Sequence, residues 1–329
     1  MNENIIISSR IRLARNLDGM PFRGVNPNPI AAKAMETLRS TDSYTLYPMT
    51  ALNKLEQARL VERHLISKEL IDCGGTAIIR ADNKISVMIG EEDHIREQCI
   101  VSGLQLKEAY EELKGIDKTL GGALKFAFNP TYGYLTSCLT NVGTGMRASV
   151  MMFLPALSLT GTLSRCISNV TRLNMAVRGV YGEGSKAEGY VYQISNQKTL
   201  GITEGDIVAS VENVAAHLVE SELRAREALM QSDPAGLKDK ILRSYGILTN
   251  CYMISKSEFL DLIAFVKLGI YYNMFTCSDY SALEGLITEI QPASLCLASG
   301  RRLDDAERDK VRASMCDKLK QIITITEVK

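Results

Sequence analysis

Ile5-Ile6-Ile7-Ser8-Ser9-Arg10-Ile11-Arg12 is the stretch from which the architecture is most directly deduced. The three isoleucines are typical of a β-strand, and the residues after them alternate between polar and apolar side chains. Successive side chains of a strand point to opposite faces, so Arg10 and Arg12 share one face. We therefore expect an early strand that presents two guanidinium groups on one side of a sheet.

The rest of the chain predicts an α+β region followed by a helical one. Alternating residues at 76–80 and 84–90 predict a hairpin, and further strands are expected at 124–128, 176–181 and 190–195. Apolar periodicity predicts helices at 51–71 and 104–119, and another that begins near 203. Beyond that helix only helical patterns follow, at 235–247, 256–270, 279–291 and 304–323. We place the division near 224–234, which gives two domains, 1–224 and 225–329.

Composition excludes several classes of protein. The 329 residues contain 38 Lys+Arg and 38 Asp+Glu, and this neutral balance argues against a nucleic-acid-binding protein. None of the eight cysteines forms a C-x-x-C pair, which argues against zinc-ribbon and thioredoxin-like sites. No apolar run reaches the roughly 18 residues of a transmembrane helix, and the first residues do not resemble a signal peptide. Scattered thiols then predict a cytoplasmic protein without a membrane partner.

A long acid-free segment gives the first indication of function. Between Lys118 and Gly182 the sequence has six Lys and Arg residues and no Asp or Glu. Such a segment is explained either by buried apolar helices and chance or by a pocket for a strongly anionic ligand such as a nucleoside triphosphate.

Two nucleotide-binding motifs can be discounted. Residues 143–148, Gly-Thr-Gly-Met-Arg-Ala, match G-x-G-x-x-A, but no acidic residue follows until Glu183, whereas a dinucleotide fold needs one about 20 residues on. The sequence contains no G-x-x-x-x-G-K-[ST] motif. A bound nucleotide would therefore be held by arginine side chains.

Acidic residues gather at one strand end, in Glu91-Glu92-Asp93-His94-Ile95-Arg96. Adjacent carboxylates are costly unless a metal ion or a substrate guanidinium compensates them, although a solvated turn is the simpler explanation. Glu183 is a further acid, on the glycine-flanked segment Gly182-Glu183-Gly184.

Five segments, in order, resemble the phosphagen (ATP:guanidino) kinases, including the bacterial branch that phosphorylates arginine in proteins. They are Ser8-Ser9-Arg10-Ile11-Arg12-Leu13-Ala14-Arg15-Asn16, Glu91-Glu92-Asp93-His94-Ile95-Arg96, Leu135-Thr136-Ser137-Cys138-Leu139-Thr140-Asn141-Val142-Gly143-Thr144, Met146-Arg147-Ala148-Ser149-Val150 and Val177-Arg178-Gly179-Val180-Tyr181-Gly182-Glu183-Gly184. The resemblance continues to about residue 320. It implies a large, mostly antiparallel sheet flanked by helices, followed by an all-α domain.

The resemblance also implies roles for individual residues. Glu92 would be the catalytic base, Glu183 a second carboxylate that grips the substrate guanidinium, and Cys138 a thiolate beside it. ATP and Mg²⁺ would be the cofactors, with Glu91 holding Mg²⁺ through water. The ATP phosphates and adenine would lie against Arg10, Arg12, Arg96, Arg147, Arg178 and His64. From the residues alone, a small buried apolar side chain is the better explanation of Cys138. His64 could equally be a structural histidine on a helix.

The segment Arg308-Asp309-Lys310-Val311-Arg312-Ala313 resembles a phosphoarginine-binding motif of the same branch. Arg308 and Arg312 are four residues apart on a predicted helix, so both would reach one phosphate. An ordinary helix face with ion pairs is the alternative. The resemblance further implies a homodimer formed through residues beyond 230, with Arg308 and Arg312 on an accessible face.

The resemblance implies partners as well. These are protein substrates with exposed arginine, an activator protein, a transcriptional repressor that is relieved under stress, and a Clp ATPase whose protease receives the marked proteins. Family members that act on small metabolites have an additional N-terminal helical domain, whereas this sequence begins in the catalytic part, so we expect an open site. A kinase of free arginine and a non-catalytic phosphoarginine reader are the alternatives. The sequence departs from the family at Leu139, normally proline, and at Gly90, normally asparagine.

Overall fold

The computed structural model describes residues 5–180 and 187–326. Its centre is an eight-stranded sheet in which neighbouring strands are antiparallel, in the order β2-β3-β4-β5-β1-β8-β10-β9. The strands are β1 (Ile6–Arg15), β2 (Tyr44–Pro48), β3 (Thr76–Arg80), β4 (Ile85–Ile89), β5 (Ile95–Ser102), β8 (Met146–Phe153), β9 (Met175–Gly179) and β10 (Val191–Asn196). The prediction of a large, mostly antiparallel sheet is confirmed.

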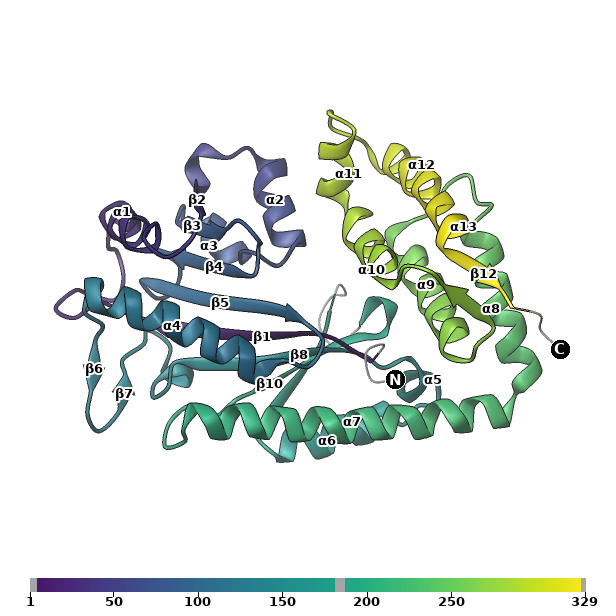
Figure 1. The fold of residues 1–329 in the computed structure, drawn as a ribbon, viewed down its shortest axis with the longest axis horizontal. Coiled ribbons are helices and arrows are strands. Elements are labelled where there is room, and N and C mark those ends of the chain that lie inside the picture. Colours follow the sequence, from purple (N-terminus) through teal and green to yellow (C-terminus); the bar gives the residue numbers. More distant parts are fainter. Residues whose placement is uncertain (1–4, 181–186, 327–329) are drawn as a thin grey trace.

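One face of the sheet forms the main core. Ile11 and Leu13 of β1 and Val150 of β8 point into it, and the helices cover it from outside. Along the three longest of these helices, apolar residues recur at helical spacing and form one buried stripe. Figure 1 shows them along the sheet: α1 (Pro27–Leu38), α4 (Leu106–Leu124), α5 (Pro155–Leu159), α6 (Leu163–Arg172) and the 29-residue α7 (Glu204–Ser232).

The opposite face is covered only in part. Met49, Ile66 and Leu70 pack on Ala77 and Ile79 beneath short helices at one side. These helices are η2 (Met49–Ala51), α2 (Lys54–Glu62) and α3 (Lys68–Asp72). At the other end, Phe153 of β8 and Val191 of β10 pack against Ala264 of the C-terminal part. The stretch of the sheet between these two contacts carries Arg10 and Arg12.

The C-terminal part is helical and has its own core, which includes Phe259, Val266 and Leu283. Its helices are α8 (Pro234–Leu248), α9 (Lys256–Tyr271), α10 (Tyr280–Glu289), α11 (Pro292–Ala298), α12 (Asp305–Met315), η5 (Cys316–Lys318) and α13 (Leu319–Ile322). It also contains a two-stranded ribbon, β11 (Phe275–Cys277) with β12 (Ile323–Ile325). Figure 1 shows α7 running from beneath the sheet to this part, with α11 facing α2.

Some predicted elements differ from the observed ones. The helix expected at 51–71 is divided into η2, α2 and α3, because the chain turns after α2. The strand expected at 124–128 is wrong, since α4 continues to Leu124. Beyond it, Phe126 forms a single bridge with Leu17, and Phe128–Asn129 (β6) pairs with Gly133–Tyr134 (β7). The hairpin at β3 and β4 is confirmed. The expected division after residue 224 falls inside α7, and the two-domain assignment stays a prediction.

Candidate active site

The exposed face of the sheet carries a row of side chains that changes from cationic to apolar. Along β1 and β8 the directly opposite residues are Arg12 and Arg147, then Arg10 and Ser149, then Ser8 and Met151. Side chains of directly opposite residues lie on the same face and are close neighbours. The row therefore has a guanidinium pair at one end and a thioether at the other.

Electrostatic repulsion is strong at the cationic end. Burial, with Arg96 and Arg147 nearby, lowers the pKa of Arg10 to about 10. The pKa of Arg12 is lowered well below its ordinary value by burial and by these neighbouring guanidinium groups. Burial, together with Arg178 and Arg96, also lowers the pKa of Arg147. Positive charge that is not neutralised by protein groups is the arrangement expected of an anion-binding surface.

The arginines are oriented mainly by neutral partners. Arg10 donates to Oε1 of Gln193 at 2.8 Å, and Arg147 donates to the Ser195 hydroxyl at 3.0 and 3.3 Å. The buried Nε of Arg12 has no hydrogen-bond partner within residues 5–180 and 187–326. Arg178, on β9 opposite Gln193, is exposed. An oligophosphate would supply the acceptors that these donors lack.

The two adjacent glutamates occupy different environments. Glu91 is buried and is bound by Arg96, at 2.8 Å from Nη1 and 2.7 Å from Nε, and by the Ser67 hydroxyl. Burial raises the pKa of Glu91, against the opposing effect of Arg96. Glu92 is exposed and, together with Arg12, Arg147 and Cys138, lines a cavity of about 160 Å³. Glu92 is therefore open to a substrate, whereas Glu91 is held by the protein.

Asp93 fixes the strand end that carries these glutamates. Its carboxylate accepts from Nδ2 of Asn16 at 2.7 Å and from the backbone N–H of Ser137 at 2.6 Å. Asn16 also accepts from the backbone N–H of His94 at 2.9 Å. The segment that precedes Cys138 is thus tied to the segment that follows Glu92. Sequence reasoning missed this role, although Asp93 and Asn16 stand inside two of the quoted segments.

Cys138 stands at the start of a short 3₁₀ helix, η3 (Leu139–Asn141). Its Sγ lies 3.0 Å from the Thr140 hydroxyl, and the side chain is half-buried. The loop is closed at its base by hydrogen bonds between Tyr134 and Gly143. Only glycine fits at Gly143, because its φ is +114° and an added Cβ would stand 2.3 Å from the Thr199 carbonyl oxygen. The loop therefore presents Cys138 to the Glu92 cavity in a fixed place.

The two departures from the family pattern have simple structural contexts. Gly90 has a φ of +78°, in the left-handed region that glycine and asparagine both accept. Leu139 is 87% exposed at the first position of η3, where proline is also well tolerated. At Gly90, however, an added Cβ would stand 2.7 Å from Cβ of Pro27, so asparagine would fit only if Pro27 shifted.

His64 follows the end of α2 with a φ of +58°, so the expectation that it lies on a helix is wrong. It lines a cavity with Ser8, Arg10, Met151 and Gln193. Burial, reinforced by Arg10, lowers the pKa of His64 to about 4. The neutral ring therefore lies beside the less cationic end of the row. Glu183, the second predicted carboxylate, lies outside the described residues.

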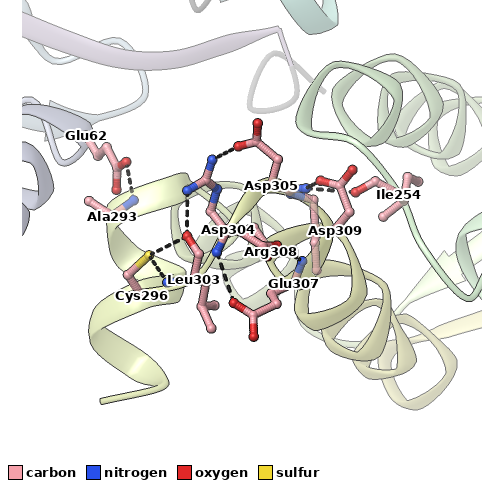
Figure 2. A network of polar contacts seen from close by, with 11 residues as sticks. Glu62, Ile254, Ala293, Cys296, Leu303, Asp304, Asp305, Glu307, Arg308 and Asp309 are labelled. Carbon is pink, nitrogen blue, oxygen red and sulfur yellow. Dashed lines mark hydrogen bonds and ion pairs between the residues drawn. The ribbon is translucent and has the colours of Figure 1, made fainter. Parts of the chain in front are cut away.

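The C-terminal motif lies on α12. Arg312 is buried and donates to the carbonyl oxygens of Ile254 at 2.7 Å and Ile290 at 3.2 Å, and it pairs with Asp309 at 2.5 Å. Arg308 donates to the Leu303 carbonyl oxygen at 2.9 Å and pairs with Asp305 (Figure 2). The expectation that both guanidinium groups are accessible is wrong for Arg312, because backbone carbonyls hold it inside, and Arg308 is half-buried. Ala313 is buried beside it.

In the part of the chain that the structure describes, no three His, Cys, Asp or Glu side chains gather to hold a metal ion. Mg²⁺ commonly binds through one or two carboxylates, waters and substrate phosphates, and the Glu91–Glu92 pair fits that smaller demand. Within the same residues, no helix combines the length and the apolar character needed to cross a membrane.

An antiparallel sheet with an arginine-lined face and a paired-glutamate strand end defines the class of guanidino phosphotransferases. The family model "ATP:guanido phosphotransferase, C-terminal catalytic domain" matches residues 28–225, and "Protein-arginine kinase McsB C-terminal domain" matches residues 234–326. The fold is similar to that of the crystal structure of lombricine kinase, with a TM-score of 0.61 and 24% identity over 69% of this chain and 68% of that one.

Curated relatives are more similar. "Protein-arginine kinase" of Caldanaerobacter subterraneus is 42% identical over 95% of this chain and 96% of the relative. That of Bacillus subtilis is 42% identical over 95% of this chain and 89% of the relative. The chain belongs to the protein-arginine kinases, an enzyme family of ATP:guanido phosphotransferases.

Proposed function

We propose that this enzyme transfers the γ-phosphoryl group of ATP directly to arginine side chains of proteins. The observation that carries the proposal is the change along β1 and β8 from the Arg12–Arg147 pair to the Ser8–Met151 pair. ATP has the same asymmetry, with charge at the triphosphate and an apolar base at the other end. The triphosphate would lie on the arginines and the adenine near Met151 and His64.

The acceptor arginine would enter the cavity lined by Glu92 and Cys138. Its guanidinium is protonated at neutral pH, so a nitrogen can attack phosphorus only as a proton leaves. Glu92, which is open to that cavity, would take the proton while the new P–N bond forms and the bond to the ADP oxygen breaks. Glu183 would bind the other side of the guanidinium, and Cys138 would contact it as a thiolate.

The arginines would stabilise the charge on the phosphoryl group during transfer. Phosphoryl transfer depends mainly on positioning and electrostatic stabilisation, which Arg10, Arg12, Arg96, Arg147 and Arg178 would supply. Mg²⁺, when bound to ATP, supplies further neutralisation, and Glu91 would hold it through water. Arg96 binds Glu91 and also lines the cavity that Glu92 lines. It would therefore hold the carboxylates and the phosphates in fixed positions relative to each other.

Regulation and partners belong to the same proposal. We propose a homodimer formed by residues beyond 230 and a phosphoarginine pocket at Arg308, Asp309, Arg312 and Ala313. Buried Arg312 would shape this pocket, and the more accessible Arg308 would meet the phosphate. An activator protein, a transcriptional repressor and a Clp ATPase are the partners we propose, in stress response and protein quality control.

The proposal is tested by incubating the protein with Mg-ATP and either a mixed protein substrate or free arginine. We expect acid-labile phosphate on arginine side chains of the protein substrate, located by mass spectrometry. Phosphorylation of free arginine alone would identify a small-molecule kinase instead. Binding of phosphoarginine without any transfer would identify a non-catalytic reader.

A further inference from the structure

Glu62, the last residue of α2, joins the catalytic part to the helical C-terminal part. Its two carboxylate oxygens accept from the backbone N–H groups of Ala293 at 2.7 Å and Ser294 at 2.9 Å, and from the Ser294 hydroxyl at 2.9 Å. Figure 2 shows Glu62 pointing at Ala293, at the start of α11. A carboxylate at this end of a helix is stabilised by unpaired N–H groups and by the helix dipole.

The contact is reinforced by apolar packing. Leu55, two turns before Glu62 on the same face of α2, packs against the buried cluster of Leu295, Cys296 and Leu303. Cys296 Sγ accepts from the backbone N–H of Leu303 at 3.4 Å. The Leu303 carbonyl oxygen in turn accepts from Arg308 (Figure 2). A continuous chain of contacts therefore runs from α12 through α11 to Glu62.

On its other side, Glu62 is five residues from a group that binds an active-site carboxylate. The hydroxyl of Ser67 binds Oε1 of Glu91, which Arg96 also binds. Within the connecting turn, Nε2 of Gln98 donates to the carbonyl oxygens of His64 at 2.8 Å and Leu65 at 3.0 Å, which ties the turn to β5. A shift of the α2 end therefore reaches Glu91 through five residues of chain and one hydrogen bond.

We propose that Glu62 is a positioning residue for phosphoryl transfer: by seating α11 on α2, it fixes the turn that places the Ser67 hydroxyl on Glu91. The proposal rests on the function proposed above, in which Glu91 and Arg96 stand beside the reacting phosphate. Glu62 touches neither substrate nor nucleotide and acts through Ser67. It makes the active-site geometry depend on whether the helical part is seated.

The test is a double-mutant cycle on the full chain, with Glu62→Ala, Ser67→Ala and both together. Loss of positioning lowers kcat for arginine phosphorylation by roughly tenfold to a hundredfold, because small misplacements at a reacting centre are costly. We expect each single variant to lower kcat with little change in the KM for ATP. We expect the double variant to be no slower than the slower single variant, because both changes interrupt one route. Additive losses would overturn the proposal.

Two further variants separate positioning from stability. Glu62→Gln keeps one oxygen acceptor, and we expect it to restore part of the lost kcat. Ser294→Ala removes one donor without touching α2, and we expect a smaller loss of the same kind. Glu36→Ala, which removes an exposed carboxylate of α1 paired with Lys33, is the matched control and should leave kcat unchanged. An equal loss in the control would overturn the proposal, and the two other variants keep it testable if Glu62→Ala does not fold.

Hydrogen exchange gives a readout that does not depend on activity. In Glu62→Ala, we expect faster amide exchange at residues 63–70 as well as at residues 292–298. Faster exchange confined to 292–298 would overturn the proposal, because the loss would then stop at the contact itself. If residues 63–70 respond but the wild type phosphorylates no arginine, the structural link stands and the proposed function fails.

Discussion

Arg12 on β1 and Arg147 on β8 stand directly opposite each other on one face of the sheet. Like charges in directly opposite positions destabilise a sheet, and Arg147 is one of the groups that lower the pKa of Arg12. The ligand-free protein therefore retains a repulsion that a bound anion would relieve. Stability and nucleotide binding should consequently respond in opposite directions when one of the two charges is removed.

Arg147→Ala tests this opposition. We expect the thermal midpoint of the ligand-free variant to equal or exceed that of the wild type, because a repulsion is removed. Nucleotide affinity should fall roughly tenfold to a hundredfold, since a hydrogen bond to a charged group is worth about 1.5–3 kcal/mol. Differential scanning fluorimetry with and without Mg-ATP measures both effects. Arg172→Ala, an exposed arginine of α6, is the control, and a full nucleotide shift in Arg147→Ala would refute the phosphate role.

Glu92→Gln tests the catalytic base. The amide keeps the shape of the side chain but cannot take up the proton, so transfer should fall by roughly 10²–10⁴-fold. Nucleotide affinity should be retained, because Glu92 carries no proposed phosphate contact. Single-turnover phosphorylation and nucleotide titration measure the two quantities separately. Near-normal turnover in this variant would remove Glu92 from the proposed mechanism.

His64→Gln tests the pH dependence of stability. Because the pKa of His64 is lowered to about 4, the unfolded chain binds a proton between about pH 6.5 and pH 4 that the folded protein excludes. The folded form is therefore destabilised as the pH falls through that window. We expect the free energy of unfolding of the wild type to decline more steeply there than that of the variant. Parallel pH profiles in urea titrations would contradict this expectation.

Exposed apolar side chains on the C-terminal part test the proposed dimer. Tyr252 is 77% exposed, and Ile247 and Met253 near it are 43% and 41% exposed. Contiguous exposed apolar groups commonly mark interfaces. We expect light scattering of the wild type to give twice the chain mass and Met253→Glu to shift the protein toward monomer with unchanged circular dichroism. A wild-type monomer, or a variant that dimerises equally well, would place the contact elsewhere.

The sequence predicted the strands and helices whose own residues alternate or recur between a buried face and a polar face. β1 was predictable because its two faces lie in different environments. Ile11 is in the main core, whereas Arg10 lines a cavity on the opposite face. Its partner β8 was not predicted, because its C-terminal residues are apolar on both faces. Phe153 can be apolar on the face opposite the main core because Ala264, which is distant in sequence, covers it. Such burial depends on tertiary packing and leaves no local periodicity.

Part of the candidate site was predictable in the same way, from alternation along a regular strand. Arg10 and Arg12 could be placed on one face because they stand on a strand that the sequence predicts, whereas the turn after α2 could not be predicted. His64 adopts a positive φ without a neighbouring glycine or proline to mark it, so the helix was expected to continue. Ser67 was missed because a serine that begins a short helix gives no indication of binding a glutamate distant in sequence.

Helix α7 connects the sheet to the helical part of the chain. Its 29 residues extend about 43 Å at 1.5 Å per residue, so one rigid rod belongs to both parts of the chain. The rod ends at Asp233-Pro234, where proline cannot continue the helical hydrogen bonds and the Asp233 side chain starts α8. We expect rotation of the helical part to occur about this joint, so that a small angle there becomes a large displacement at α11. Spin-label distances between α7 and α11 would measure that swing.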